Sequence, residues 1–200
     1  MIASPNPPLM TLEEYLELEE NSPIKHEYLD GHVYAMAGGT LDHGAIATNI
    51  ITLLRSHLRG GPCRVYNSDV KVRLGPRRFV YPDASVACAE RDRVNGRATF
   101  ITDPRLVVEV LSLSTAQYDQ GDKFAMYGQL DSLADYVLVS TNQRRVEVRT
   151  RVAGDAWPAH VFVPGDDIVL ESLDLRVPLA AFYEDIELEE RPPRPRPGRV

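Results

Sequence analysis

The sequence has little cysteine and no long apolar run, and both absences narrow the class of protein it encodes. Two cysteines, Cys63 and Cys88, are too few for a disulfide framework and form no CxxC motif. Because both stand in apolar surroundings, we expect free thiols of the core in a reducing cytoplasm. No stretch approaches the roughly 18 apolar residues of a membrane span. Residues 1–10 lack the basic and apolar segments of a secretory signal, so we expect no membrane partner.

An excess of positive charge is also missing. The net charge is −7, which argues against a surface coated with positive charge for nucleic acid, although local arginine clusters remain. Such clusters are more often solvated faces than binding surfaces. With 200 residues, 44% of them apolar and 26% charged, the chain has the composition of one globular domain.

Hydrophobic periodicity and turn residues predict a single α/β domain with a mixed sheet and helices on its faces. The predicted helices begin at a Thr11–Glu14 capping box and cover 42–58, 120–130 and 178–183. The predicted strands are a hairpin over 26–36, a half-buried strand over 69–74 with Lys71 on its polar face, a strand over 79–88 interrupted by Pro82, and strands over 106–111, 136–140, 146–151, 160–163 and 168–170. Residues 89–104 are predicted to form a loop, residues 1–10 a flexible N-terminus, and 189–200 a disordered tail rich in Arg and Pro.

Glu109 is the first candidate for chemistry. It is the one charge in the apolar run Leu106–Leu111, a pattern typical of a strand covered on both faces. Burying a lone carboxylate costs several kcal/mol, so it must be protonated, paired or bound to a cation. The alternative to a functional site is a buried ion pair with an arginine.

Asp83 is the second candidate, in the sequence Tyr81-Pro82-Asp83. A Pro-Asp pair is common in turns, which is the alternative here, but Ala84 to Val86 continue as a strand. If adjacent strands bring Asp83 beside Glu109, the two like charges need a cation between them. Carboxylate oxygens suit Mg²⁺, Mn²⁺ or Ca²⁺.

Lys123 lies on the predicted helix that follows the Glu109 strand, so its ammonium group can reach the carboxylates. There it would orient or deprotonate a water, or neutralise charge on a phosphate. A surface lysine is the alternative. Tyr127 is one turn further on the same face, where a helix aromatic is more often part of the core.

An acid, then an apolar strand with a glutamate, then a lysine resembles the PD-(D/E)XK nucleases, and the chain more closely resembles the Uma2 family (DUF820) over about residues 10–187. The matching segments are Thr11–Tyr15, Glu27–Gly31, Met36, His43, Tyr81–Val86, Leu106–Ser112, Asp119, Lys123, Tyr127 and Asp135–Val139. Two positions depart from the patterns. Leu111 stands where the superfamily has its lysine, which the Uma2 pattern places on the following helix, and Asp135 stands where Uma2 proteins usually have Glu.

This resemblance implies a restriction-endonuclease-like fold over residues 11–188, and Mg²⁺- or Mn²⁺-dependent cleavage of DNA phosphodiester bonds. Asp83 and Glu109 match the metal-binding acids, Glu27 matches an N-terminal acid that joins the site, and Lys123 stands in for the catalytic lysine. The resemblance also implies a homodimer. A non-catalytic module that binds DNA or a protein partner is the main alternative, and a hydrolase of another phosphate ester is a third.

Two further residues join Tyr127 as possible accessory members of the site. His43 stands near a helix N-terminus, where a capping or packing role competes with a role in the site. Asp69 shares a strand face with Lys71 and Arg73, and either lines the site or is solvated.

Overall fold

The N-terminal elements of the computed structural model, which describes residues 9–94, 96–112 and 115–188, follow the predicted pattern. Thr11 and Glu14 form the capping box of α1 (Leu12–Asn21). Strands β1 (His26–Leu29) and β2 (His32–Ala35) form the hairpin, and Asp30 and Gly31 both have positive φ, as a tight two-residue turn requires. Within the range predicted to be flexible, Met10 donates its amide to the Gly31 carbonyl at 2.8 Å. Residues 1–8 and 189–200 lie outside the described residues.

Three sheets make up the β-structure. A five-stranded sheet has the order β2-β1-β5-β4-β7, with β4 (Lys71–Gly75), β5 (Arg78–Val80) and β7 (Phe100–Ile101). A six-stranded sheet has the order β11-β10-β9-β8-β6-β3, with β3 (Arg64–Asn67), β6 (Ala84–Ala87), β8 (Pro104–Leu111), β9 (Asp135–Ser140), β10 (Val146–Thr150) and β11 (Ala159–Phe162). A third sheet pairs β12 (Asp167–Leu170) with β13 (Leu175–Pro178). The central pair β8 and β9 is parallel and its neighbours are antiparallel, which confirms the mixed sheet.

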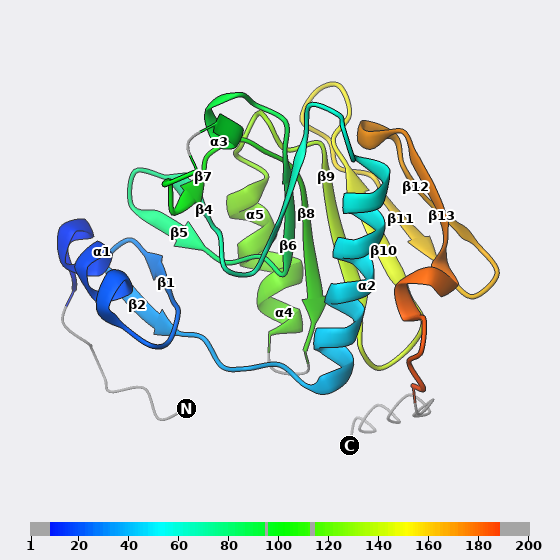
Figure 1. The fold of residues 1–200 in the computed structure, drawn as a ribbon, viewed down its shortest axis with the longest axis horizontal. Helices are drawn as coiled ribbons and strands as arrows, with labels where there is room; N and C mark the ends of the chain where they lie inside the picture. The colour runs from blue at the N-terminus through cyan, green and yellow to red at the C-terminus, as the bar shows by residue number, and fades with distance from the viewer. Residues whose placement is uncertain (1–8, 95, 113–114, 189–200) are drawn as a thin grey trace, which may run out of the picture.

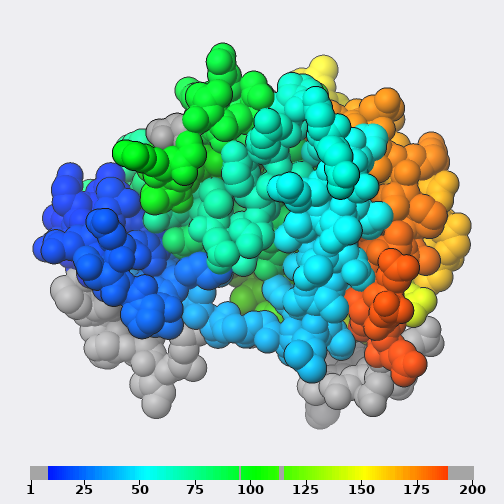
Figure 2. All heavy atoms as spheres, in the orientation of Figure 1, coloured from blue at the N-terminus to red at the C-terminus, as the bar shows by residue number. Residues whose placement is uncertain are grey.

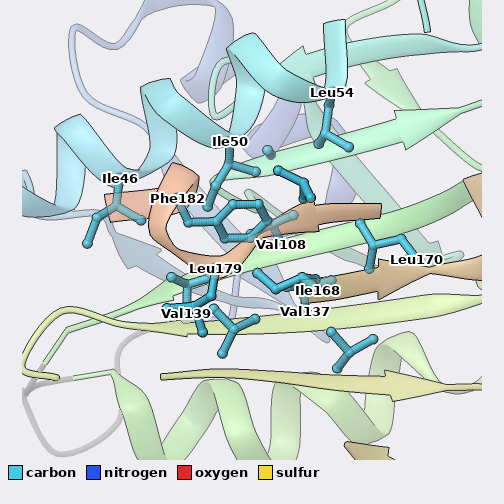
Figure 3. Close-up of a cluster of buried hydrophobic side chains, with 14 of the residues drawn as sticks. Ile46, Ile50, Leu54, Val108, Val137, Val139, Ile168, Leu170, Leu179 and Phe182 are labelled. Atoms are coloured by element: carbon cyan, nitrogen blue, oxygen red, sulfur yellow. The ribbon is translucent and has the colours of Figure 1, made fainter. Parts of the chain in front are cut away.

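Helices cover both faces of the six-stranded sheet (Figure 1). On one face lies α2 (Leu41–His57), which buries Ile46, Ile50 and Leu54 at helical spacing. These side chains meet Val108, Val137, Ile168 and Phe182 in a hydrophobic cluster that β12, β13 and the 3₁₀ turns η2 (Glu171–Leu173) and η3 (Leu179–Tyr183) help to close (Figure 3). On the other face lie α4 (Ala116–Tyr118), the π-helical turn η1 (Asp119–Lys123) and α5 (Phe124–Tyr127).

Several predicted elements differ from the observed ones. The predicted loop 89–104 contains the short helix α3 (Arg91–Val94), β7 and the first residue of β8. The predicted strand 79–88 is two strands in different sheets, because Pro82 has no amide hydrogen for a ladder. Strands β3 and β13 are absent from the predicted elements, and the helix after β8 begins at Ala116 rather than at 120. Lys71 does not face solvent, because α1 covers that side of β4 and leaves the lysine only 5% exposed.

The prediction of free cysteines is wrong, because Cys63 and Cys88 form a disulfide. The cause is strand register. Arg64 pairs with Ala87 across β3 and β6, so the next residues outward, Cys63 and Cys88, stand opposite each other. They pack at the edge of the apolar cluster around α2. Among the described residues, no helix combines the length and the apolar character needed to cross a membrane.

Candidate active site

Glu109 points to the face of β8 opposite the apolar cluster. Val108 and Val110 face α2, whereas Val107 and Leu111 belong to the second cluster, beneath α4 and α5, and Glu109 lies between these two residues on their face of the strand. Its side chain is buried, with the residue 3% exposed. Burial raises the pKa of Glu109 well above its usual value, and the nearby charge of Lys123 opposes this only in part. The carboxyl group is therefore held in a place where it needs a cation or a proton.

The ammonium group of Lys123 meets that need. Its Nζ lies 2.9 Å from Glu109 Oε1, 3.3 Å from Glu27 Oε1 and 3.7 Å from Asp119 Oδ1. It also donates to the Tyr81 carbonyl at 3.3 Å. Burial alone would lower the pKa of Lys123, but the three carboxylates outweigh burial and raise it. The expected surface-lysine alternative is excluded, because the residue is only 4% exposed.

The π-helical turn η1 places both Lys123 and Asp119 at its ends. Such turns are rare and occur often at functional sites. Asp119 is 4% exposed, and burial raises its pKa while Lys123 acts in the opposite direction. We did not include Asp119 among the predicted site residues. Its spacing of four residues from Lys123, on one helical face, is the sequence signal that could have added it.

Glu27 reaches the same lysine from the other sheet. It lies on β1, and its Oε1 accepts the Tyr81 amide at 3.2 Å in addition to facing Lys123. The Tyr118 hydroxyl approaches its Oε2 at 3.5 Å. The main chain at Tyr81, between the two sheets, is thus held by Glu27 through its amide and by Lys123 through its carbonyl. No sequence signal marks this role of Glu27 and Lys123, because both side chains bind backbone groups of Tyr81, and these do not depend on its side chain.

Asp83 stands on the β8 side of this group. Its Oδ2 accepts the Val110 amide at 2.7 Å and lies 3.3 Å from His43 Nε2. The Val110 contact fixes Asp83 one residue beyond Glu109, and the negative charge of Asp83 contributes to the raised pKa of Glu109. Its side chain is 19% exposed, so Asp83 lies nearer to solvent than Glu109.

His43 contacts Asp83 through its ring and is not the helix cap. Thr40 is the N-cap of α2 and accepts the His43 amide through its hydroxyl. The hydrogen bond with Asp83 raises the pKa of His43, against the effect of burial. A Cβ at Gly39 would lie 2.7 Å from His43 Nδ1, so glycine lets the chain pass close to the imidazole. This segment, between β2 and α2, spans a hollow in Figure 2.

The other two accessory candidates lie in different surroundings. Tyr127 is fully buried under the helix, its ring packs on Tyr136, and its hydroxyl has no hydrogen-bond partner among the described residues. Burial first and then the charge of Glu109 raise its pKa. Asp69 is exposed and binds Lys25 and Asn67, and no contact joins it to the acidic group in the part of the chain that the structure describes.

The charges of the site do not balance. Glu27, Glu109 and Asp119 surround one ammonium group, and Asp83 adds a fourth carboxylate next to Glu109. Such a set favours binding of protons or of a cation. Within residues 9–94, 96–112 and 115–188, no group of three or more His, Cys, Asp or Glu side chains is arranged to hold a metal ion. Any protein ligands to a metal here would therefore be few, as is usual for Mg²⁺.

Comparison with known proteins gives a consistent result. The Uma2 family, described as "Putative restriction endonuclease", matches residues 12–180. Two proteins of Synechocystis sp. are similar: uncharacterized protein slr1290 is 40% identical over 93% of this chain and 99% of its own length, and uncharacterized protein sll1609 is 29% identical over 74% and 85%. A crystal structure of a "putative nuclease belonging to DUF820" from Anabaena variabilis superposes with a TM-score of 0.73 at 18% identity, covering 86% of this chain and 97% of the other. The fold and the extent of the family match together show that this chain belongs to the Uma2 family.

Proposed function

We propose that this protein is a Mg²⁺- or Mn²⁺-dependent endonuclease that hydrolyses DNA phosphodiester bonds, with Asp83, Glu109 and Lys123 as its catalytic residues. One observation carries the proposal: a buried ammonium group lies 2.9 Å from Glu109, and Asp83 is fixed to the next residue of the same strand. Membership of a family described as "Putative restriction endonuclease" supports the same reaction class.

The residues present fit a divalent cation held by few protein ligands. Asp83 and Glu109 provide hard carboxylate oxygens, and Mg²⁺ is commonly bound by one or two carboxylates with waters and substrate phosphates completing the shell. When bound, such a cation would polarise the phosphate and lower the pKa of an attacking water. Glu27 is the third proposed ligand, and in this structure its Oε1 lies 3.3 Å from Lys123.

Lys123 supplies positive charge to the site. Its ammonium group is already close to three carboxylates and a carbonyl, which favour the charged form. It therefore suits the role of neutralising negative charge that develops on a phosphate, a role that fixed charges perform well in sites that exclude water. Asp119 and Glu27 orient the lysine, and His43 orients Asp83.

Plasmid cleavage tests this proposal. We expect the purified protein to nick or linearise plasmid DNA with Mn²⁺ and not with EDTA, and we expect Asp83→Asn and Lys123→Met to lose the activity. A matched control is Asp69→Asn, which removes an acid that does not contact the site. Equal cleavage by all four proteins would assign the activity to a contaminant and end the proposal.

A second candidate is a nuclease-fold module that binds DNA or a protein without cleaving it. The absence of a cluster of three or more metal-ligating residues in the described part of the chain favours it. Calorimetric titration with Mn²⁺ separates the two functions. Binding that disappears in Glu109→Ala supports the enzyme, and no binding at all supports the module. The homodimer is likewise a proposal, and sedimentation equilibrium would test it.

A further inference from the structure

A second buried lysine lies outside the acidic site. The chain has 22 lysines and arginines, of which only Lys25, Lys71 and Lys123 are lysines. Arginine thus supplies nearly all of the positive charge. Lys123 belongs to the acidic site, and the two other lysines line one pocket. This placement makes the pocket the only part of the described chain, apart from the acidic site, where a lysine ammonium group is found.

The Lys71 ammonium group has no anionic partner within ion-pair distance among the described residues. Instead it lies 5.7 Å from the ring centre of Tyr15 and 5.8 Å from that of Tyr81. Its residue is 5% exposed, and burial lowers the pKa of Lys71, with only the more distant charge of Glu19 acting against this. A buried ammonium group without a counterion is costly, and an anion beside it would remove that cost.

The other charged groups of the pocket already have partners. Glu19 accepts hydrogen bonds from the His26 amide and from the hydroxyls of Tyr15 and Tyr81. Lys25 pairs with Asp69 at 3.2 Å. Among the described residues of the pocket, Lys71 is therefore the charged side chain that remains available to bind a ligand.

The pocket is large enough for a small organic anion. Its volume is about 440 Å³, within the range of small-molecule sites. Pro23, Ile24, Val70 and Ala98 give it apolar walls, and Ser22 and Thr99 add hydroxyls. Segments from four places build it: the end of α1 with the turn after it, the start of β4, Tyr81 after β5, and the segment before β7. Such a mixed lining suits a ligand with one charged group and a less polar remainder.

Tyr81 connects the pocket to the acidic site. Its amide and carbonyl are bound by Glu27 and Lys123, and its side chain lines the pocket beside Lys71. A strand whose scissile phosphate lay in the acidic site would have neighbouring nucleotides close to this residue. Lysine is a common partner for phosphate as a point charge.

We propose that this pocket binds the phosphate group of a nucleotide, with Lys71 as its charge partner. The choice of phosphate over another anion rests on the proposed nuclease function. The nucleotide is either part of a DNA strand or a free mononucleotide. The opposing explanation is that the rings of Tyr15 and Tyr81 alone stabilise the ammonium group, as cation–π contacts do, and that the pocket takes no anion.

NMR of the full-length protein labelled at lysine Cε tests this directly, because three lysines give three signals that single substitutions can assign. The titrants are dAMP and a short 5′-phosphorylated single strand, without divalent metal, and deoxyadenosine is the control without phosphate. We expect a saturable shift of the Lys71 signal with dAMP, little change at Lys123, and no shift with deoxyadenosine. A shift with the single strand as well identifies the strand as a source, and a shift with dAMP alone identifies a free-nucleotide site. No shift of Lys71 at millimolar dAMP, or an equal shift with deoxyadenosine, overturns the proposal.

Variants provide the second measurement. We expect Lys71→Met to weaken dAMP binding by about tenfold or more, which is the effect of roughly 1.4 kcal/mol. Lys71→Arg should retain binding, because it keeps the charge. Arg73→Met is the matched control: it removes a charge from the same strand, where Arg73 packs on Phe79 and Phe100 outside the pocket. Equal binding by Lys71→Met and the wild type would refute the assignment. Asp83→Asn should still bind dAMP, so the pocket can be confirmed even if no cleavage is found.

Discussion

The two faces of the six-stranded sheet differ at Glu109, although they share the same strands and each carries an apolar cluster. On the α2 face, Val108 and Val110 join a cluster of hydrophobic side chains. On the other face, Glu109 lies between them in sequence and meets a lysine and further acids. A shift of one residue along β8 separates the core from the candidate site. The apolar face provides rigidity, and the charged face can accept groups that are costly to bury.

Replacing Lys123 with Met should produce the largest change in the free energy of unfolding. The expected loss comes from the ion pairs on the Glu109 face of the sheet. Met has a similar size, so packing is kept, while Glu109, Glu27 and Asp119 lose their counterion. Removing one partner of a buried ion pair costs about 3–5 kcal/mol. Urea unfolding at pH 7 would measure it. The double variant Glu109→Gln, Lys123→Met should recover part of the loss, and a double variant less stable than Lys123→Met would contradict the pairing.

The second largest effect should be on the rate of DNA cleavage, which we expect to fall for a substitution on the Glu109 face and not for one on the α2 face. We expect Glu109→Gln to lower the Mn²⁺-dependent rate by about 100- to 1000-fold, the usual effect of removing one electrostatic group from an active site. Ile50→Val, on the apolar face, should leave the rate per folded molecule unchanged. Initial rates of plasmid nicking, corrected for folded fraction by circular dichroism, would show this. A similar fall in both variants would mean that the faces are not functionally distinct.

The disulfide belongs to the apolar face, so its loss should affect stability and leave cleavage intact. Cys63 and Cys88 are separated by 25 residues, and a bridge closing a loop of this size contributes about 3 kcal/mol. Replacing both with Ala should lower the free energy of unfolding by that amount. Reduction of the wild type should give the same result. Loss of Mn²⁺-dependent activity in a folded double variant would show that the bridge also positions Asp83.

The smallest effect concerns pH. Glu109 has a raised pKa in the folded protein, so the folded state binds its proton more tightly than the unfolded state does. The stability from this proton is fully present below the unfolded pKa of about 4.5 and is lost as pH rises toward the folded pKa. The slope is up to about 1.4 kcal/mol per pH unit. Urea unfolding in EDTA at several pH values should show it, and Glu109→Gln should be less pH dependent. The difference between the two proteins isolates Glu109, because carboxyl groups with lowered pKa, such as Asp103 and Glu147, act in the opposite direction in both. Equal pH dependence in the wild type and in Glu109→Gln would contradict the raised pKa of Glu109.

Much of the fold follows from local sequence. The capping box at Thr11, the Asp30-Gly31 turn and the spacing of Ile46, Ile50 and Leu54 each fix an element through contacts within a few residues. The pairing of Cys63 with Cys88 and the burial of Lys71 depend instead on strand register and on the position of α1. Those are set by long-range contacts, which no short window of sequence contains.

The candidate site likewise has residues that local sequence predicts and contacts that depend on the three-dimensional arrangement. An acid in an apolar strand must find a partner, so Glu109 could be identified from burial energy alone. The strand and helix patterns also offered Asp83 and Lys123 as weaker candidates, and the family pattern joined them into one site and added Glu27. Asp119 shares a helical face with Lys123 and is one of the positions shared with the Uma2 family, and these two signals together could have added it to the predicted site. The contacts of Lys123 and Glu27 with the Tyr81 backbone depend on how the two sheets meet, and no residue type reports that.

Residues 81–83 are the short covalent crossing from the five-stranded to the six-stranded sheet. Their main chain and the Asp83 side chain are bound by groups from β1, β8 and η1. Because the same charged groups form the site and join the sheets, the shape of the molecule and the charge state of the site are coupled. A substitution that removes the Lys123 ammonium group would therefore also release the Tyr81 carbonyl, at the junction of the two sheets.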